Sequence, residues 1–136
     1  MLVIDKTNKT KIKKVLVVDD DRLILGSIKK QLKDEMLSIQ LIDDPIEALA
    51  EVGKNKYDLV LCDIRMKSIS GLEVLKRLKS NYPDVPVIII SGYIDDKIMK
   101  DAKNLGSNAF LIKPITKKIL IDSIHNVFNK SLIYKD

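Results

Sequence analysis

Five short apolar runs alternate along the chain with longer stretches in which apolar residues recur every three or four positions. The runs cover residues 15–18, 39–41, 59–62, 87–90 and 109–112. Short β-branched runs bounded by charge predict strands, and the periodicity between them predicts amphipathic helices. Strands that alternate with helices form a parallel sheet with right-handed crossovers and helices on both faces. The sequence therefore predicts a doubly wound, three-layer α/β/α domain.

The helical periodicity identifies the side chains expected to face the sheet. These are Leu25, Ile28, Leu32 and Met36, then Val74, Leu75 and Leu78, then Ile94, Ile98, Ala102 and Leu105, and finally Leu120, Ile124, Val127 and Phe128. Asp44, Pro45 and Glu47 have the order of a cap, a first-turn proline and a capping-box partner, so they predict the start of the second helix. Gly106 is expected to end the fourth.

The 136 residues fit one domain, and their net charge of +5 is unevenly distributed. Residues 1–14 contain five lysines and one aspartate, so the rest of the chain carries only +1. We expect a basic N-terminal extension over 1–12 that is a solvated tail, a domain over 13–129, and a C-terminal tail over 130–136. This C-terminal tail has little to anchor it, although Leu132, Ile133 and Tyr134 could extend the last helix. A nearly neutral domain does not predict direct nucleic-acid binding.

Two features bear on the compartment. No apolar run approaches the roughly 20 residues that span a bilayer, and the apolar start of the chain is too short for a signal peptide. The single cysteine, Cys62, excludes an internal disulfide and suits a reducing environment. We therefore expect a cytoplasmic protein without membrane contact, in which Cys62 packs in the core and His125 is a surface or half-buried side chain.

Polar residues follow four of the predicted strands. Asp19, Asp20 and Asp21 follow the first, Asp63 the third, Ser91 the fourth and Lys113 the fifth. All carboxyl ends of a doubly wound parallel sheet lie on one edge, and ligands bind there beside the switch point in strand order. These side chains are therefore expected to converge on one site, with one aspartate, Asp21, capping the next helix.

The charge of this predicted site favours a bound cation. Asp19, Asp20 and Asp63 together carry three negative charges, and Lys113 returns only one positive charge. Two carboxylates about 4 Å apart repel by roughly 4 kcal/mol at an effective dielectric constant near 20. Hard oxygen donors with room for water suit Mg²⁺ (or Mn²⁺). A carboxylate can also be the nucleophile that forms an aspartyl phosphate, while a metal and a lysine neutralise the transferred group.

Along residues 13–128 the chain resembles the receiver domain of two-component response regulators. Four motifs carry the resemblance: Val17-Val18-Asp19-Asp20, Leu61-Cys62-Asp63-Ile64-Arg65-Met66 followed by Gly71-Leu72, Ile90-Ser91-Gly92, and Phe110-Leu111-Ile112-Lys113-Pro114. The resemblance implies a flavodoxin-like fold with five helices and a five-stranded parallel sheet in the order 2-1-3-4-5.

The resemblance also implies a role for each residue of the metal and acceptor site. Asp63 would be the phospho-acceptor and a metal ligand, and Asp20 a direct metal ligand. Asp19 would act on the metal largely through water, and Arg65 would lend its backbone carbonyl. Lys113, with Ser91, would assist phosphoryl transfer.

Ser91 and Phe110 would form the switch that responds to phosphorylation, and the Lys113–Pro114 bond is expected to be cis. One departure stands out, because the family often has proline four residues beyond the acceptor and this chain has Lys67. We therefore expect that loop to be looser or differently turned. Arg65 and Tyr93 are expected at the mouth of the pocket, where they would obstruct the water that hydrolyses the phosphorylated form.

The implied function is that of a phosphorelay signalling domain. The phosphoryl donor would be a sensor histidine kinase or a histidine phosphotransfer protein. The fourth helix, fifth strand and fifth helix would contact a downstream protein target or form a phosphorylation-dependent dimer. The domain would catalyse its own phosphorylation and autodephosphorylation without being a turnover enzyme. Two organisations fit: a stand-alone receiver, or part of a longer regulator or hybrid kinase.

Three alternative functions compete with this interpretation. A pseudo-receiver that only binds proteins is opposed by the complete set of site residues. A haloacid-dehalogenase-like phosphatase needs an acid/base aspartate two residues after the nucleophile, and the chain has Arg65 there. A nucleotide- or flavin-binding module needs a glycine- or serine-rich phosphate cradle after the first strand, and three aspartates stand there instead.

Overall fold

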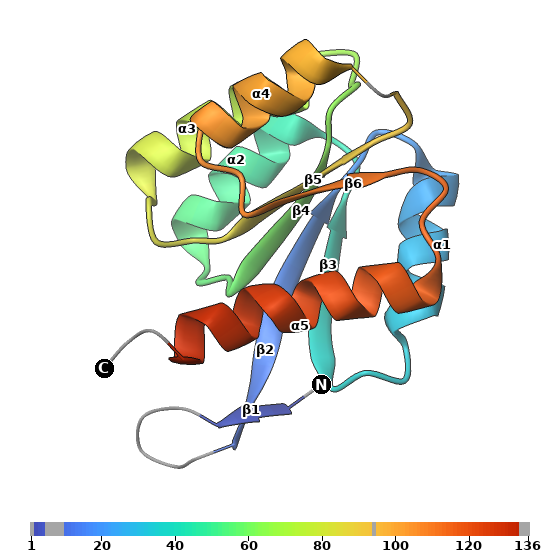
Figure 1. The fold of residues 1–136 in the computed structure, drawn as a ribbon, viewed down its shortest axis with the longest axis vertical. Coiled ribbons are helices and arrows are strands. Elements are labelled where there is room, and N and C mark those ends of the chain that lie inside the picture. The colour runs from blue at the N-terminus through green and yellow to red at the C-terminus, as the bar shows by residue number, and fades with distance from the viewer. Residues whose placement is uncertain (1, 5–9, 94, 134–136) are drawn as a thin grey trace.

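A computed structural model describes residues 2–4, 10–93 and 95–133, with side chains described for 12–93 and 95–129 (Figure 1). The strands are β1 (Leu2–Ile4), β2 (Thr10–Val18), β3 (Leu37–Ile42), β4 (Leu59–Asp63), β5 (Val87–Ser91) and β6 (Ala109–Ile112). The helices are α1 (Arg22–Leu32), α2 (Pro45–Lys54), α3 (Gly71–Asn81), α4 (Asp96–Asn104) and α5 (Lys117–Ile133).

The main sheet is parallel and has the order β3-β2-β4-β5-β6. These strands correspond to the five predicted apolar runs, so the predicted order 2-1-3-4-5 is confirmed. β2 and β4 are neighbours although β3 lies between them in the sequence, which places the switch point in strand order beside the carboxyl end of β2.

Alternate side chains of the sheet pack into two separate apolar layers. Val15 and Val17 of β2, and the residues in register with them, contact α1 and α5. Leu16 and Val18 contact the opposite layer, formed with α2, α3 and α4 (Figure 1). This two-residue period explains why the central strands read as continuous apolar runs, since both of their faces are covered.

Side-chain caps begin the helices where the sequence indicated. The Asp21 carboxylate accepts the Leu23 N–H at the start of α1, and the Asp44 carboxylate accepts the Ile46 N–H at the start of α2. Both predicted caps are confirmed. The predicted inward residues of α3 and α5 are buried, and Gly106, which follows α4, adopts a φ of 99° that suits glycine.

The structure departs from the sequence prediction at the N-terminus. β1 pairs antiparallel with the first residues of β2, in a ladder from Leu2 opposite Ile12 to Ile4 opposite Thr10. The backbone at these positions is therefore extended and paired, and the prediction of a solvated tail is wrong for them. β-branched residues on both sides of the lysine-rich segment favour this ladder.

Two smaller differences concern helix ends. α1 ends at Leu32, and residues 33–36 form a turn followed by a bend, so the prediction that Met36 continues the inward face of this helix is wrong; Met36 is 49% exposed. The Glu35 N–H donates to the Leu32 carbonyl in this turn. α5 continues to Ile133, within the segment expected to be the C-terminal tail, while the predictions for Ile94 and Tyr134 lie outside the described residues.

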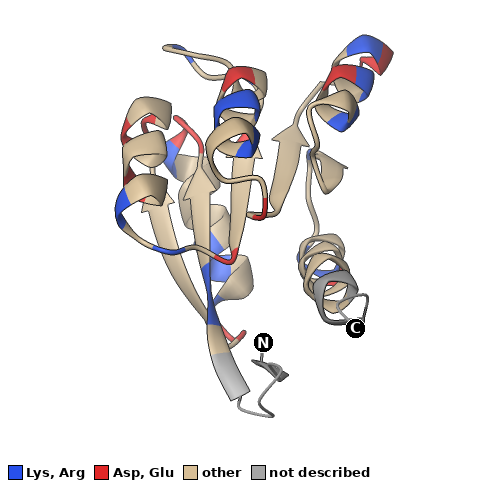
Figure 2. Cartoon of the chain, turned by 90° about the vertical axis from the view of Figure 1, so that its left-hand side faces the viewer, with Lys and Arg blue, Asp and Glu red and all other residues tan. Residues whose placement is uncertain are grey.

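None of the helices in the described ranges combines the length and hydrophobicity that a membrane span requires. Charged residues lie mainly on the helices and at the ends of the strands (Figure 2).

Candidate functional site

The pairing register brings the predicted site residues together. Val17 of β2 lies opposite Leu61 of β4, and the residues two positions later are Asp19 and Asp63. Because side chains repeat every second residue along a strand, both carboxylates fall on the face that carries α1 and α5. Lys113 stands two positions after Leu111, which packs into that same layer. Strand periodicity thus places the side chains of Asp19, Asp63 and Lys113 on the same face at the carboxyl ends of their strands.

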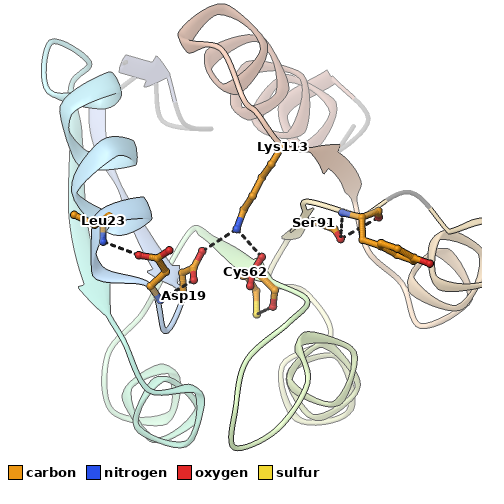
Figure 3. A network of polar contacts seen from close by, with 8 residues as sticks. Asp19, Leu23, Cys62, Ser91 and Lys113 are labelled. Atoms are coloured by element: carbon orange, nitrogen blue, oxygen red, sulfur yellow. Dashed lines mark hydrogen bonds and ion pairs between the residues drawn. The ribbon is translucent and has the colours of Figure 1, made fainter.

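The Lys113 ammonium lies between the two buried carboxylates (Figure 3). Its Nζ is 2.9 Å from Asp63 Oδ1 and 3.2 Å from Asp19 Oδ2. Asp19 is only 3% exposed and Asp63 only 6%. Asp19, Asp20 and Asp63 each contribute a carboxylate oxygen to a group whose members lie within 4.8 Å of one another. The predicted convergence of Asp19, Asp20, Asp63 and Lys113 is therefore found.

Negative charge is in excess at this site, and it shifts the pKa values of Asp19 and Lys113. Burial raises the pKa of Asp19 and the nearby charge of Asp63 raises it further, whereas the Asp21 N–H and Lys113 lower it by less. Burial alone would lower the pKa of Lys113, but the hydrogen bond and charge of Asp63, with those of Asp19, outweigh it and raise that pKa. Lys113 therefore stays charged and leaves the three carboxylates only partly neutralised.

The donor set fits a hard divalent cation. Three carboxylates and one ammonium leave a surplus of two negative charges, which a divalent ion would balance. Oxygen donors with few protein ligands suit a cation that retains waters and accepts a phosphate oxygen. The structure thus supports a divalent-metal site made by Asp19, Asp20 and Asp63, and the Arg65 carbonyl remains a predicted ligand.

Main-chain N–H groups hold the two neighbouring aspartates in place. The Asp21 N–H donates to Asp19 Oδ1 over 2.9 Å, within the β2–α1 loop. Asp20 Oδ2 accepts the Lys67 N–H over 2.9 Å, from the loop that follows Asp63. The loop predicted to be looser or differently turned at Lys67 is thus hydrogen-bonded to the β2–α1 loop, here called the acidic loop because it carries Asp19, Asp20 and Asp21. Proline at position 67 could not have made this bond, because it has no N–H.

Gly71 lets the first turn of α3 pack directly on the backbone of the acceptor segment. A Cβ at this position would lie 2.0 Å from the Asp63 carbonyl oxygen and 2.8 Å from the Ile64 Cα. The Gly71 N–H donates to the Ile64 carbonyl over 2.7 Å, which closes the base of the loop. Any larger residue would have to displace the backbone of Asp63.

Ser91 and Phe110 lie on the other face of the sheet. Ser91 stands two residues after Ile89, which is in register with Phe110, and both Ile89 and Phe110 pack into the layer that contains α2, α3 and α4. The buried Ser91 hydroxyl donates to the Tyr93 carbonyl and accepts the Tyr93 N–H, both over 3.1 Å (Figure 3). The two predicted switch residues thus occupy diagonal positions on the same face of adjacent strands, and the Ser91 hydroxyl is hydrogen-bonded to the β5–α4 loop.

A pocket of about 370 Å³ opens above the carboxylates. Its lining consists of Asp19, Asp20, Asp21, Asp63, Arg65, Gly92, Tyr93 and Lys113. The Arg65 guanidinium lies over the Tyr93 ring, 4.3 Å from its centroid, and so connects the loops after β4 and β5. The expected position of Arg65 and Tyr93 at the mouth is confirmed.

Three local predictions are also confirmed. Cys62 is fully buried with its pKa raised by burial, His125 is half-buried, and the Lys113–Pro114 bond is cis, all as expected.

Three features of the site were not predicted from the sequence: the Lys67–Asp20 bond, the fit of Gly71 against Asp63, and the Tyr93 backbone contacts of Ser91. They depend on main-chain geometry, and of the three only the glycine has a signal in the sequence.

Comparison with known proteins identifies one family. The family model for the response regulator receiver domain matches residues 15–125. Among curated relatives, the transcriptional regulatory protein ZraR of Klebsiella oxytoca is 36% identical over 101 residues, which are 74% of this chain and 23% of ZraR. Response regulator MprA of Mycobacterium sp. (strain KMS) is 32% identical over 79% of this chain and 47% of MprA. The chain thus spans a quarter to a half of these relatives.

Solved structures agree in fold over nearly their whole length. A CheY-like receiver domain protein from Methanospirillum hungatei JF-1 superposes with a TM-score of 0.85 and 28% identity, covering 88% of this chain and 96% of that one. A receiver domain protein from Clostridium thermocellum gives a TM-score of 0.84 and 30% identity, over 90% and 98% of the two chains. The CheY-like, flavodoxin-like fold is therefore established.

Proposed function

The chain belongs to the response regulator receiver domain family, and on that premise we propose that Asp63 accepts a phosphoryl group in a Mg²⁺-dependent reaction. The observation that carries the proposal is the Asp63 carboxylate, 2.9 Å from the Lys113 ammonium and grouped with Asp19 and Asp20 at the base of an open pocket. Asp19 has the same neighbours, but both of its carboxylate oxygens already accept hydrogen bonds, Oδ1 from the Asp21 N–H and Oδ2 from Lys113.

In the proposed step an Asp63 oxygen attacks phosphorus. With a phosphohistidine donor, a P–O bond forms, the P–N bond breaks, and its electron pair stays on the departing imidazole nitrogen. Lys113 would neutralise charge on the phosphoryl oxygens. Asp20 and Asp63, with Asp19 through water and the Arg65 carbonyl, would hold Mg²⁺, which supplies further charge neutralisation.

The proposed switch follows from the present contacts of Ser91. Its hydroxyl is satisfied by the Tyr93 main chain, so a phosphoryl oxygen must offer a better partner to move it. A hydrogen bond to a charged acceptor is worth about 1.5–3 kcal/mol, against about 1 kcal/mol for a neutral one. Movement of Ser91 would vacate space for the half-buried Phe110 and alter the surface made by α4, β6 and α5.

The proposed partners lie at the two ends of a signalling step. A sensor histidine kinase or histidine phosphotransfer protein would donate the phosphoryl group in the cytoplasm, and the α4–β6–α5 surface would bind a protein target or a second copy of the chain. We propose no direct nucleic-acid contact by this domain. The domain would promote its own phosphorylation and dephosphorylation without turning over a separate substrate.

Acetyl phosphate with Mg²⁺ tests the proposal without a kinase. Intact-mass measurement should show one added phosphoryl group on the wild type, suppression by a chelator, and none on Asp63→Asn. Asp44→Asn is the matched control, since it changes a capping aspartate outside the pocket and asparagine caps equally well. Equal labelling of Asp63→Asn and the wild type would refute Asp63 as the acceptor.

A further inference from the structure

Asp19 and Asp20 are adjacent in the sequence but are held in different ways. Asp19 is buried, accepts the Asp21 N–H within its own loop and pairs with Lys113. Asp20 is half-buried and accepts the main-chain N–H of Lys67, a residue 47 positions away in the loop between β4 and α3. A hydrogen bond to Asp20 therefore joins the acidic loop to the loop between β4 and α3, here called the acceptor loop because it follows Asp63.

The donor to Asp20 is neutral. Of the ion pairs formed by the described side chains, none includes Asp20. A carboxylate has about four acceptor positions, and the Lys67 N–H occupies one of them on Oδ2. An ammonium in the same place would compete with a metal by cancelling charge, whereas a peptide N–H orients the carboxylate and leaves its charge available.

We infer that the Lys67 main-chain N–H is a positioning group for metal binding, which fixes the Asp20 carboxylate and docks the acceptor loop before the cation arrives. The inference rests on the proposed function, because it assigns Asp20 to the metal. The loop is then fastened at two points: at its base by the Gly71 N–H to the Ile64 carbonyl, and at Lys67 by Asp20. Preorganised ligands bind more tightly because less conformational freedom is lost on binding.

The role belongs to the main chain of Lys67 and not to its exposed side chain. Lys67→Ala keeps the N–H and removes the ammonium, whereas Lys67→Pro removes the N–H. Loss of one hydrogen bond of ordinary strength should weaken Mg²⁺ binding by about fivefold in Lys67→Pro. Lys67→Ala should bind Mg²⁺ at least as tightly as the wild type, since only a nearby positive charge is lost.

Amide hydrogen exchange without metal tests the contact itself and does not require the proline variant to fold. The Lys67 amide should be protected in the wild type and should exchange about tenfold faster in Asp20→Ala. The Gly71 amide, bonded to Ile64 in the same loop, is the internal control and should keep its protection. Equal exchange of the Lys67 amide in both proteins would overturn the inference.

Calorimetric Mg²⁺ titration then tests the consequence. Wild-type affinity in Lys67→Pro, or an equal loss in Lys67→Ala, would also overturn the inference, because the N–H would then not be the group that acts. These results are separable from the proposed function. If the exchange and titration follow expectation while Asp63→Asn is still labelled, the acceptor assignment fails and the positioning role stands.

Discussion

Two half-buried lysines lie at opposite edges of the sheet, and their pKa values shift in opposite directions. Lys79, near the amino ends of β5 and β6, donates to the Val85 carbonyl and to the Asn108 side-chain oxygen. Burial lowers its pKa, and the charge of Asp84 offsets this only in part. Lys113, at the carboxyl edge, is also partly desolvated, yet Asp63 and Asp19 raise its pKa.

The difference shows that the amino ends of the strands carry contacts that stabilise the fold, whereas the carboxyl ends carry the candidate site. At the amino edge, the Asn108 side-chain oxygen accepts hydrogen bonds from both the Val87 N–H and the Lys79 ammonium, so a neutral acceptor satisfies two donors and connects three segments. At the carboxyl edge the charges do not balance within the protein. The surplus of negative charge there costs stability, and a divalent cation could neutralise it.

The largest expected effect separates the two lysines kinetically. Lys113→Met should slow phosphorylation by acetyl phosphate about 100-fold or more, because a preorganised charge at the transferred group is lost. Lys79→Met should keep the rate within about twofold, since neither of the residues that accept hydrogen bonds from Lys79, Val85 and Asn108, lines the pocket. Initial rates of mass gain measure both, and comparable slowing in the two variants would contradict a functional division between the edges.

The next effect concerns the lifetime of the phosphorylated state. Arg65 and Tyr93 stack at the pocket mouth and should obstruct the attacking water. Arg65→Ala/Tyr93→Ala should therefore lose its phosphoryl group about tenfold faster, which corresponds to about 1.4 kcal/mol of barrier. Decay is followed by intact mass after removal of the donor. Coincident decay curves for variant and wild type would show that these residues do not control hydrolysis.

Stability without metal should change in opposite directions at the two edges. Asp19→Asn should raise the free energy of unfolding by about 1 kcal/mol, because it removes a buried charge that repels Asp63. Asn108→Ala should lower it by about 1–3 kcal/mol, because the Val87 N–H and Lys79 lose an acceptor. Urea unfolding in a chelator measures both. Destabilisation by Asp19→Asn would contradict the claim of surplus charge.

The smallest expected effect is on how the free energy of unfolding changes with pH near 10.5, the ordinary pKa of lysine. The folded-state pKa of Lys113 is raised, so its stabilisation is present below this pH and is lost as pH rises through the higher folded value. The folded-state pKa of Lys79 is lowered, so its contribution grows as pH rises towards 10.5. Unfolding of the wild type, Lys113→Met and Lys79→Met across this range should give difference curves of opposite slope, and parallel curves would contradict the comparison.

The sequence predicted the features that depend on side-chain periodicity and failed where main-chain pairing decides. The convergence of the strand ends predicted one site for Asp19, Asp63 and Lys113, and the alternating burial of β2 and β4 shows why Asp19 and Asp63 share a face. The β1–β2 ladder and the Lys67–Asp20 bond involve backbone groups that every residue except proline carries. The β-branched residues near the N-terminus favour an extended backbone without specifying its partner, and no residue type marks the Lys67–Asp20 bond.

The central claim is that the carboxyl edge directs phosphorylation to a single aspartate. Borohydride reduction of the phosphorylated protein converts an aspartyl phosphate to homoserine, which peptide mass mapping locates to one position. We expect homoserine at position 63 alone, in Mg²⁺-treated protein and not after chelation. Homoserine at position 19, 20 or 21, or modification that persists without a divalent cation, would contradict the account.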